Sequence, residues 1–190
     1  LWPIWPTIAR AEAVLLDWLA EHAPATRALH ASTAALRALR DRVQQLRPEL
    51  NCDLGALRRE SIRMALQQAG DPPQLAEPAF EVFLAERQRV DLFDDALPAL
   101  QYLSRRWPVV ALSNGNADVH QMGLGHYFHA TVNAREAGVP KPDARIFHQA
   151  AMAAGVGPDQ VLHIGDDAHL DTQGAMQAGL QAVWLNRAGS

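Results

Sequence analysis

Cysteine is almost missing from this chain of 190 residues, because Cys52 is the only one. No disulfide can form within the chain, which excludes a disulfide-stapled secreted scaffold and favours a cytoplasmic, reducing compartment. Long apolar runs are missing as well. None approaches the roughly 18 to 20 residues of a membrane-spanning helix, so we expect no membrane partner. Residues 1–6 have no basic segment ahead of an apolar one, and we do not expect them to be a signal peptide.

Lysine is scarce too: 16 of the 17 basic residues are arginines, and Lys141 is the only lysine. The net charge is −4, and residues 91–190 contain 10 acidic against 6 basic side chains. A face that binds nucleic acid needs a surplus of basic residues to displace counterions from phosphates, so we expect no nucleic-acid partner. Apolar residues make up 48% of the chain, which is typical of a globular protein with a substantial core.

Residues 1–90 contain only helical patterns. Apolar side chains recur at steps of three and four, the period of an amphipathic helix, in the segments 8–21, 25–46, 54–68 and 73–89. Thr7 is expected to cap the first segment, and Gly70 to end the third, since prolines follow shortly after it. The sequence therefore predicts an all-helical module over residues 1–90, in which residues 1–7 form the start of a linker to the next domain.

The pattern changes after Val90. Two short apolar runs, 109–112 and 161–164, end in polar turn residues and are typical of buried parallel strands. Weaker strands are expected at 130–134 and 181–186, and helices at about 94–106, 143–154 and 170–179. Alternating strands and helices predict a doubly wound parallel sheet, an α/β domain over residues 91–190 into which the helical module is inserted as a cap.

Three polar loops follow this pattern at the ends of strands or between them. Ser113, Asn114 and Gly115 end the first strand, Lys141 lies in a proline-flanked loop, and Asp166 and Asp167 end the third strand. Ligands of open α/β sheets bind beyond the carboxyl ends of the strands, so these loops are expected to share one crevice. A hydroxyl, an ammonium and carboxylates with Mg²⁺ together suit a phosphoryl group.

Each loop also has a simpler interpretation. A Ser-Asn-Gly turn is usually only a turn, and a lysine between prolines is usually solvated surface. Asp166, Asp167 and the nearby Asp171 would also be favourable at the start of the next helix, where carboxylates complement the helix dipole. Their order and their positions at strand ends make the shared site the better interpretation.

Together these residues resemble the haloacid dehalogenase superfamily, in the subfamily with a helical C1-type cap. Val109 to Asn116, with Ser113, is similar to the second motif of the family, and Gly138 to Asp143, with Lys141, is similar to its third. The segment 165–171, with Asp166, Asp167 and Asp171, is similar to its fourth, and residues 182–187 are similar to a branch acting on flavin mononucleotide and other small phosphates. The dense part of the match covers about residues 92–187.

The resemblance implies a role for each of these residues. Ser113, with the backbone of Asn114 and Gly115, would hold the phosphoryl oxygens, and Lys141 would neutralise the charge on the phosphate and the nucleophile. Asp166 would bind Mg²⁺, while Asp167 and Asp171 would orient the site from behind it. The implied function is a Mg²⁺-dependent phosphatase that hydrolyses a small phosphorylated metabolite, a phosphomonoester, through an aspartyl-phosphate.

One motif of the family is not found in the sequence. The first, Asp-x-Asp-x-Thr, supplies the nucleophile and the general acid and base, and Leu1-Trp2 resembles the pair that follows it. In the family its strand lies between those ending at Ser113 and Asp166. We therefore expect the nucleophile upstream of Leu1. Without that strand, a gap of roughly 9–10 Å flanked by unpaired backbone groups would remain, and we would expect no phosphatase turnover.

Two other functions stay open. The first is dehalogenation of 2-haloacids without a metal, and the second is phosphate binding without catalysis if the chain starts at Leu1. Substrate specificity is expected from the cap, where Arg59 and Arg63 share a helix face and could meet anions, and where Trp2 or Trp5 could stack on a flat ring. Solvated arginines and packed tryptophans are the simpler interpretation. A monomer and a homodimer are both compatible with the sequence.

Overall fold

The computed structural model describes residues 1–187, which form two compact units. The first spans Leu1–Pro98 and the second begins at Ala99. None of the helices in the described part of the chain combines the length and the apolarity that a membrane span requires.

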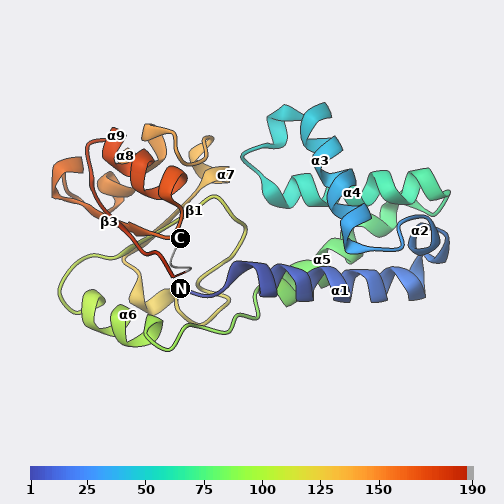
Figure 1. The fold of residues 1–190 in the computed structure, drawn as a ribbon, viewed down its shortest axis with the longest axis horizontal. Coiled ribbons are helices and arrows are strands. Elements are labelled where there is room, and N and C mark those ends of the chain that lie inside the picture. Colours follow the sequence, from blue (N-terminus) through green and yellow to red (C-terminus); the bar gives the residue numbers. More distant parts are fainter. Residues whose placement is uncertain (188–190) are drawn as a thin grey trace. The chain divides into compact units, whose positions relative to one another are not determined.

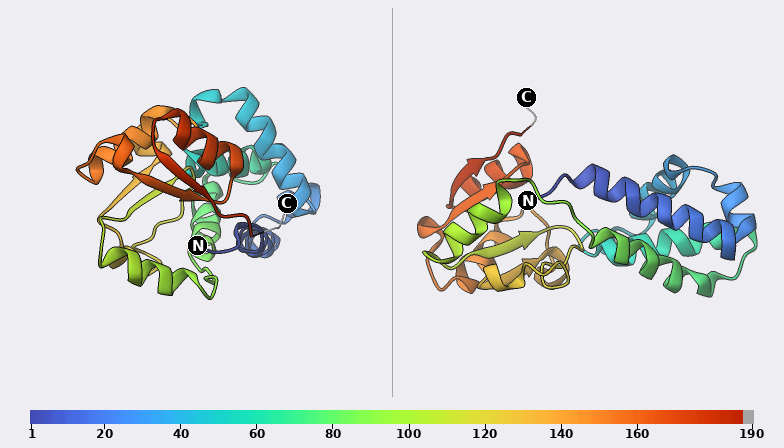
Figure 2. Two further views of the ribbon diagram at one scale, coloured as in Figure 1. Left: turned by 60° about the vertical axis from the view of Figure 1, so that its left-hand side comes forward. Right: turned by 90° about the horizontal axis from the view of Figure 1, so that it is seen from below.

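The first unit is helical throughout (Figures 1 and 2). Its elements are α1 (Ile4–His22), α2 (Pro24–Leu29), α3 (Thr33–Leu46), the 3-10 turn η1 (Pro48–Leu50), α4 (Leu54–Ala69), the 3-10 turn η2 (Pro73–Leu75) and α5 (Ala76–Arg87). The helix predicted over 54–68 is confirmed as α4. It ends as expected at Gly70, which adopts a left-handed conformation with φ of 81° that few other residues accept.

Two of the predicted helix limits are wrong. Helix α1 begins at Ile4, so Thr7 lies inside its first turn, where its hydroxyl donates a hydrogen bond to the Pro3 carbonyl at 3.0 Å. The single helix predicted over 25–46 is two helices, α2 and α3, separated at residues 30–32. Ser32 causes the restart, because its side chain accepts a hydrogen bond from the Ala35 amide at 3.2 Å and so caps α3.

The core of the first unit lies between α1, α3, α4 and α5, and α1 runs beside α5 (Figure 1). Its apolar members include Leu15, Leu19 and Leu66, all fully buried. One charged group enters this region: Glu12 is buried, and its carboxylate accepts hydrogen bonds from Arg37 at 2.8 Å and from Arg58 at 3.2 Å. A buried carboxylate is tolerated only when it is paired in this way.

In the second unit, strands alternate with helices. After α6 (Ala96–Ser104), which crosses from the first unit, come β1 (Val110–Ser113), η3 (Gly125–Tyr127), β2 (Ala130–Asn133), α7 (Ala134–Ala137), α8 (Ala144–Ala153), η4 (Pro158–Gln160), β3 (Leu162–Gly165), η5 (Ala168–Gln173), α9 (Gly174–Gln177) and β4 (Gln181–Trp184). All four predicted strands are confirmed to within two residues. The helix predicted over 170–179 is instead a π-helix, η5, followed by the short α9.

The four strands are parallel and form two pairs. Val110 of β1 lies opposite Ala130 of β2, and Leu162 of β3 lies opposite Gln181 of β4. Within residues 1–187, the two pairs are not hydrogen-bonded to each other, so β1 and β3 each have a neighbour on one side only. That a further strand belongs between those that end at Ser113 and Asp166 stays a prediction.

Helices hold the strand ends in place. Helix α8 packs on β1 and β2, while η5 packs on β3 and β4, and Ile146 and Phe147 of α8 are fully buried between these layers. The outer faces of the strands are less well covered, since Leu162 and Ile164 of β3 are 54% and 47% exposed. The strands that carry the polar loops are thus supported by α8 and η5.

Candidate active site

Three loops that are far apart in the sequence meet through Lys141. The side-chain amide of Asn114 makes two hydrogen bonds with the backbone of Lys141: its Oδ1 accepts from the Lys141 amide at 2.7 Å, and its Nδ2 donates to the Lys141 carbonyl at 3.0 Å. The ammonium of Lys141 then donates to Asp171 Oδ1 at 2.5 Å. The structure therefore brings Asn114, Lys141 and Asp171 together, while the shared site that includes Ser113, Asp166 and Asp167 stays a prediction.

The loop that carries Lys141 is fixed at its far end as well. Asp143 caps α8 by accepting a hydrogen bond from the Arg145 amide at 2.9 Å. Gly174, at the start of α9, lies so close to Pro142 that a Cβ there would be 2.9 Å from the proline ring. The Lys141 side chain is consequently presented from a rigid segment, and only 12% of it is exposed.

Asp171 is the centre of the polar contacts. It is 4% exposed and lies in η5. Besides Lys141, it meets His163 Nε2 at 2.9 Å and the Asp167 amide at 3.2 Å. Burial alone would raise its pKa, but the hydrogen bond with His163, the charge and hydrogen bond of Lys141 and the Asp167 amide together hold the pKa of Asp171 below its usual range. Asp171 is thus a fixed negative charge that orients Lys141.

Gly165 makes this approach of Asp171 possible. A Cβ built on Gly165 would lie 2.3 Å from both Cβ and Cγ of Asp171, a distance that real atoms do not adopt. Glycine is required at this position because η5 folds back over the end of β3. Gly165, the first residue of the predicted Gly-Asp-Asp turn, therefore leaves the space that the Asp171 carboxylate occupies.

His163 is a site residue that the sequence analysis missed. It contacts Asp171 directly, and the ring of Phe147 meets its own ring edge-on at 5.2 Å between centroids. Side chains of a strand alternate between its faces, so His163 and Gly165 lie on the same side of β3. The sequence does contain a sign of this role, because His163 is a polar residue inside an otherwise apolar strand, two positions before Gly165.

The loop after β1 is held by its own hydrogen bonds. Ser113 Oγ accepts from the Gly115 amide at 2.9 Å, and the Asn114 side chain is engaged by Lys141. Ser113 is thus the direct neighbour of the residue that binds the backbone of Lys141. That Ser113, Asn114 and Gly115 hold phosphoryl oxygens stays a prediction.

The two consecutive carboxylates after β3 differ in their surroundings. Asp167 caps η5, because its Oδ1 accepts from the amides of His169 and Leu170 at 2.9 and 2.7 Å. Asp166 is exposed, and its backbone carbonyl accepts a hydrogen bond from the Trp184 indole at 3.0 Å. The residues 1–187 contain no cluster of three or more His, Cys, Asp or Glu that could hold a metal by themselves.

The donors present nevertheless fit Mg²⁺ in the way this ion usually binds. Mg²⁺ takes oxygen ligands and is often held by one or two carboxylates, with water and substrate phosphate completing its shell. Asp166 is the exposed carboxylate that suits this role, whereas Asp171 is occupied by Lys141 and His163.

Arg59 and Arg63 lie on α4 in the first unit, where acidic side chains balance them. Arg63 Nη2 donates to Glu77 at 2.9 Å and its Nη1 pairs with Glu60, while Arg59 lies 3.7 Å from Glu77 and over the ring of Phe80. Trp5 is exposed and Trp2 is half-buried. A role for these four residues in specificity stays a prediction.

The low pKa of Asp171 leads to a prediction about stability. An aspartate in an unfolded chain titrates near pH 3.9, so a carboxylate with a lower pKa in the folded state stabilises the fold above about pH 4. This contribution is lost as the pH falls toward the lower pKa of the folded state. We expect the difference in unfolding free energy between the wild type and Asp171→Asn to shrink between pH 6 and pH 3, measured by urea denaturation. Asp159→Asn, which changes an exposed acid of the same unit, should keep the wild-type pH dependence, and a constant difference for Asp171→Asn would contradict the assignment.

The sequence pattern of the haloacid dehalogenase-like hydrolases matches residues 4–179, nearly the whole chain. The chain belongs to this family. Its parallel strands with intervening helices are the Rossmann-like core of haloacid dehalogenase-like hydrolases, and the helices of the first unit are consistent with their cap. The resemblance inferred from the sequence is therefore confirmed.

Individual relatives within the haloacid dehalogenase-like family differ in what they act on. The 5-amino-6-(5-phospho-D-ribitylamino)uracil phosphatase YigB of Escherichia coli (strain K12) is 33% identical over 184 residues, which cover 95% of this chain and 76% of the relative. A phosphoserine phosphatase of Thermus thermophilus is 37% identical, with coverage of 70% and 56%. The crystal structure of a 2-haloacid dehalogenase from Pseudomonas syringae pv. Tomato DC3000 superposes with a TM-score of 0.92 at 38% identity, covering 100% of this chain and 84% of that one.

Proposed function

We propose that this hydrolase is a Mg²⁺-dependent phosphatase that acts on a small phosphorylated metabolite. The observation that carries the proposal is the nearly buried Lys141, whose backbone is bound by the Asn114 side chain and whose ammonium donates to Asp171. Exposed Asp166 ends β3, and the hydroxyl of Ser113 ends β1. YigB and the Thermus enzyme are both phosphatases, which supports the same reaction class.

The nucleophile in this proposal is an aspartate upstream of Leu1, on a strand that inserts between β1 and β3. The support is the open edge of each of these strands among the described residues. A parallel strand paired with both would bring its carboxyl end to the same edge as Ser113 and Asp166. Attack of its aspartate on phosphorus would give an aspartyl-phosphate, which water then hydrolyses.

The residues of this chain would then position charge around the phosphoryl group. Lys141 offsets the negative charge of the phosphate and the nucleophile, and Asp171 with His163 fixes the ammonium in place. Ser113 and the backbone of Asn114 and Gly115 hold the phosphoryl oxygens. Asp166 would hold Mg²⁺, which would supply positive charge that stabilises the phosphoryl group.

The 2-haloacid dehalogenase of P. syringae favours a second candidate, because its structure matches this chain along its full length. Dehalogenation also needs a fixed cation and an aspartate nucleophile, but no metal. The exposed Asp166 has no assigned role in that reaction, whereas it has one in a Mg²⁺-dependent phosphatase. For this reason phosphate ester hydrolysis remains our proposal.

A release assay with the full-length protein separates these functions. We expect phosphate release from a panel of sugar, nucleotide, flavin and amino-acid phosphates with Mg²⁺, and a loss of at least about a hundredfold when EDTA removes the metal. Chloride release from 2-chloropropionate that persists in EDTA would instead establish the dehalogenase. Thermal stabilisation by phosphate with neither product would indicate a binding protein. Cytoplasmic location and a monomer or homodimer belong to the same proposal.

A further inference from the structure

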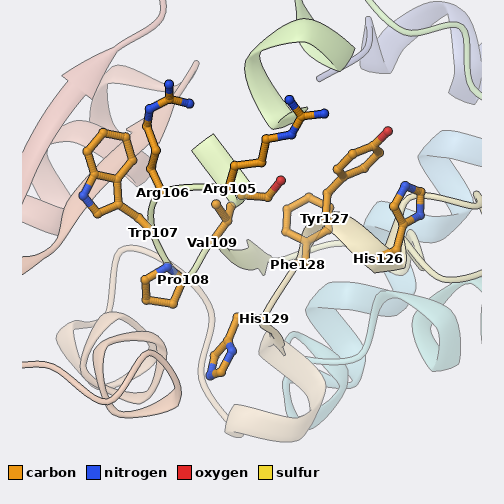
Figure 3. A pocket seen from close by; sticks show the side chains of 10 residues that line it. Arg105, Arg106, Trp107, Pro108, Val109, His126, Tyr127, Phe128 and His129 are labelled. Carbon is orange, nitrogen blue, oxygen red and sulfur yellow. The ribbon is translucent and has the colours of Figure 1, made fainter. Parts of the chain in front are cut away.

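A hollow lies in the second unit at the amino ends of β1 and β2, and Figure 3 shows the side chains that line it. Its volume is about 430 Å³, and residues 104–109 and 126–129, which precede these two strands, line it. Ser113 stands at the other end of β1, about 10 Å from Val110 at the usual rise of 3.3 Å per residue. The hollow and the candidate active site therefore occupy opposite ends of the same strands.

The hollow is lined by basic side chains, although acidic residues outnumber basic ones over residues 91–190. Arg105, Arg106, His126 and His129 line it, and no carboxylate does. Among the described residues, Arg105 and Arg106 are exposed and have no carboxylate within ion-pair distance, whereas Arg145 of the same unit is paired with Asp143. Two neighbouring guanidinium groups without a counter-ion, in a region where acids outnumber bases, indicate a site for an anion.

Aromatic rings border the two arginines. The guanidinium of Arg106 lies 3.7 Å from the ring centroid of Tyr102 and donates to the Tyr102 carbonyl at 2.9 Å, so it is held in place before any ligand arrives. Trp107 is 57% exposed, with its ring centroid 6.4 Å from that of Tyr102. The exposed indole of Trp107, next in the chain to the held guanidinium of Arg106, offers a flat ring a stacking surface.

The floor of the hollow is built from backbone hydrogen bonds. The His129 amide donates to the Val109 carbonyl at 2.7 Å, which joins the two lining segments. The amides of Tyr127 and Phe128 donate to Leu124 and Gly125 at 3.0 and 3.1 Å. Figure 3 shows the tips of Arg105, Arg106 and Tyr127 pointing to the same side, while His129 points to the other. The backbone that carries the lining side chains is thus hydrogen-bonded, and Arg106 is the arginine whose side chain is held as well.

We propose that this hollow binds a nucleoside diphosphate, with its phosphates on Arg105 and Arg106 and its base stacked on Trp107. The two requirements of such a ligand, negative charge and a flat ring, match the two kinds of side chain that are exposed here. The volume of the hollow falls in the range of about 300–1,000 Å³ typical of small-molecule sites. The proposal does not depend on the reaction at the other end of the strands.

Calorimetric titration of the full-length protein in EDTA tests the site, with ADP as the probe. Pyrophosphate and adenosine, which each keep one half of the ligand, are expected to bind at least about tenfold more weakly than ADP. The double variant Arg105→Gln/Arg106→Gln should weaken ADP binding by at least about tenfold, because it removes the charged donors. Arg42→Gln, which removes an exposed arginine on α3, should leave ADP binding unchanged. Trp107→Ala should weaken binding of ADP but not of pyrophosphate.

Binding at the active site is excluded by a further variant. Lys141→Ala should retain ADP binding, whatever its effect on phosphate release. Unchanged ADP binding in the double arginine variant, equal affinity for pyrophosphate and ADP, loss of binding in Lys141→Ala, or no heat at millimolar ADP would each overturn the proposal. Circular dichroism of every variant checks that the fold persists.

Discussion

Replacing Lys141 with alanine is expected to lower the rate of phosphate release by about a thousandfold, the upper end of what the loss of one pre-arranged charged donor costs. Lys141 is the only lysine of the chain, and its ammonium is one of the few charges that the site holds nearly buried. In the proposed mechanism the residues of this chain supply position and charge rather than the covalent bond, so the loss of a fixed positive charge acts directly on the transition state. Initial rates with saturating Mg²⁺ measure the effect.

The structure offers controls for this variant. The two hydrogen bonds that Asn114 makes go to the backbone of Lys141, so the loop should keep its place in Lys141→Ala. Arg145→Ala removes an exposed guanidinium near the same loop and should change the rate less than twofold, as expected of a solvent-exposed pair with Asp143. His163→Leu, which loosens Asp171, should lower the rate by about ten- to a hundredfold. If Lys141→Ala kept a tenth of the wild-type rate, its proposed role would be wrong.

Gly165→Ala should impair both stability and activity. A methyl group at this position would overlap Asp171, whose Cβ and Cγ lie 2.3 Å from where it would stand. Overpacking of this kind costs about 1–3 kcal/mol of unfolding free energy. Because relief requires Asp171 to move away from Lys141, we also expect phosphate release to fall by about a hundredfold, the effect of displacing a catalytic group by roughly 1 Å. Urea denaturation and initial rates measure the two effects.

A double-mutant cycle distinguishes this overlap from a general defect. In the Asp171→Ala background only the Cβ remains, so part of the overlap is relieved and the added cost of Gly165→Ala should be smaller than in the wild type. Gly157→Ala is the matched control, because the new methyl group would meet only the tip of the exposed Asp159 side chain at 2.8 Å, which can turn away. Additive costs in the cycle would show that the contact between Gly165 and Asp171 is not the cause.

Much of the fold follows from local signals in the sequence. Asp53 and Asp143 cap helices α4 and α8 where the patterns predict their starts, and Gly70 ends α4 through its left-handed backbone. The strands were found because buried parallel strands are short, apolar and bounded by turn residues. The expected meeting of loops follows from a general rule, that polar side chains at the carboxyl ends of parallel strands share one edge of the sheet. Asn114 and Lys141, 27 positions apart, are hydrogen-bonded to each other as this rule suggests.

Other features depend on contacts that sequence periodicity does not reveal. Thr7 has a capping side chain but donates to the Pro3 carbonyl instead, because the helix starts one turn earlier. The π-helix η5 carries no periodic signature, since its extra residue per turn serves to place Asp171 over Gly165. The role of His163 likewise depends on a partner eight positions away that only the folded chain brings near.

The unpaired edges of β1 and β3 also affect the tendency of the protein to aggregate. Among residues 1–187, each edge presents unpaired backbone groups, and Leu162 and Ile164 beside them are largely uncovered. Such edges are templates for strand exchange between molecules and for aggregation. The strand proposed to insert between β1 and β3 would therefore also protect the hydrolase from pairing with its own copies.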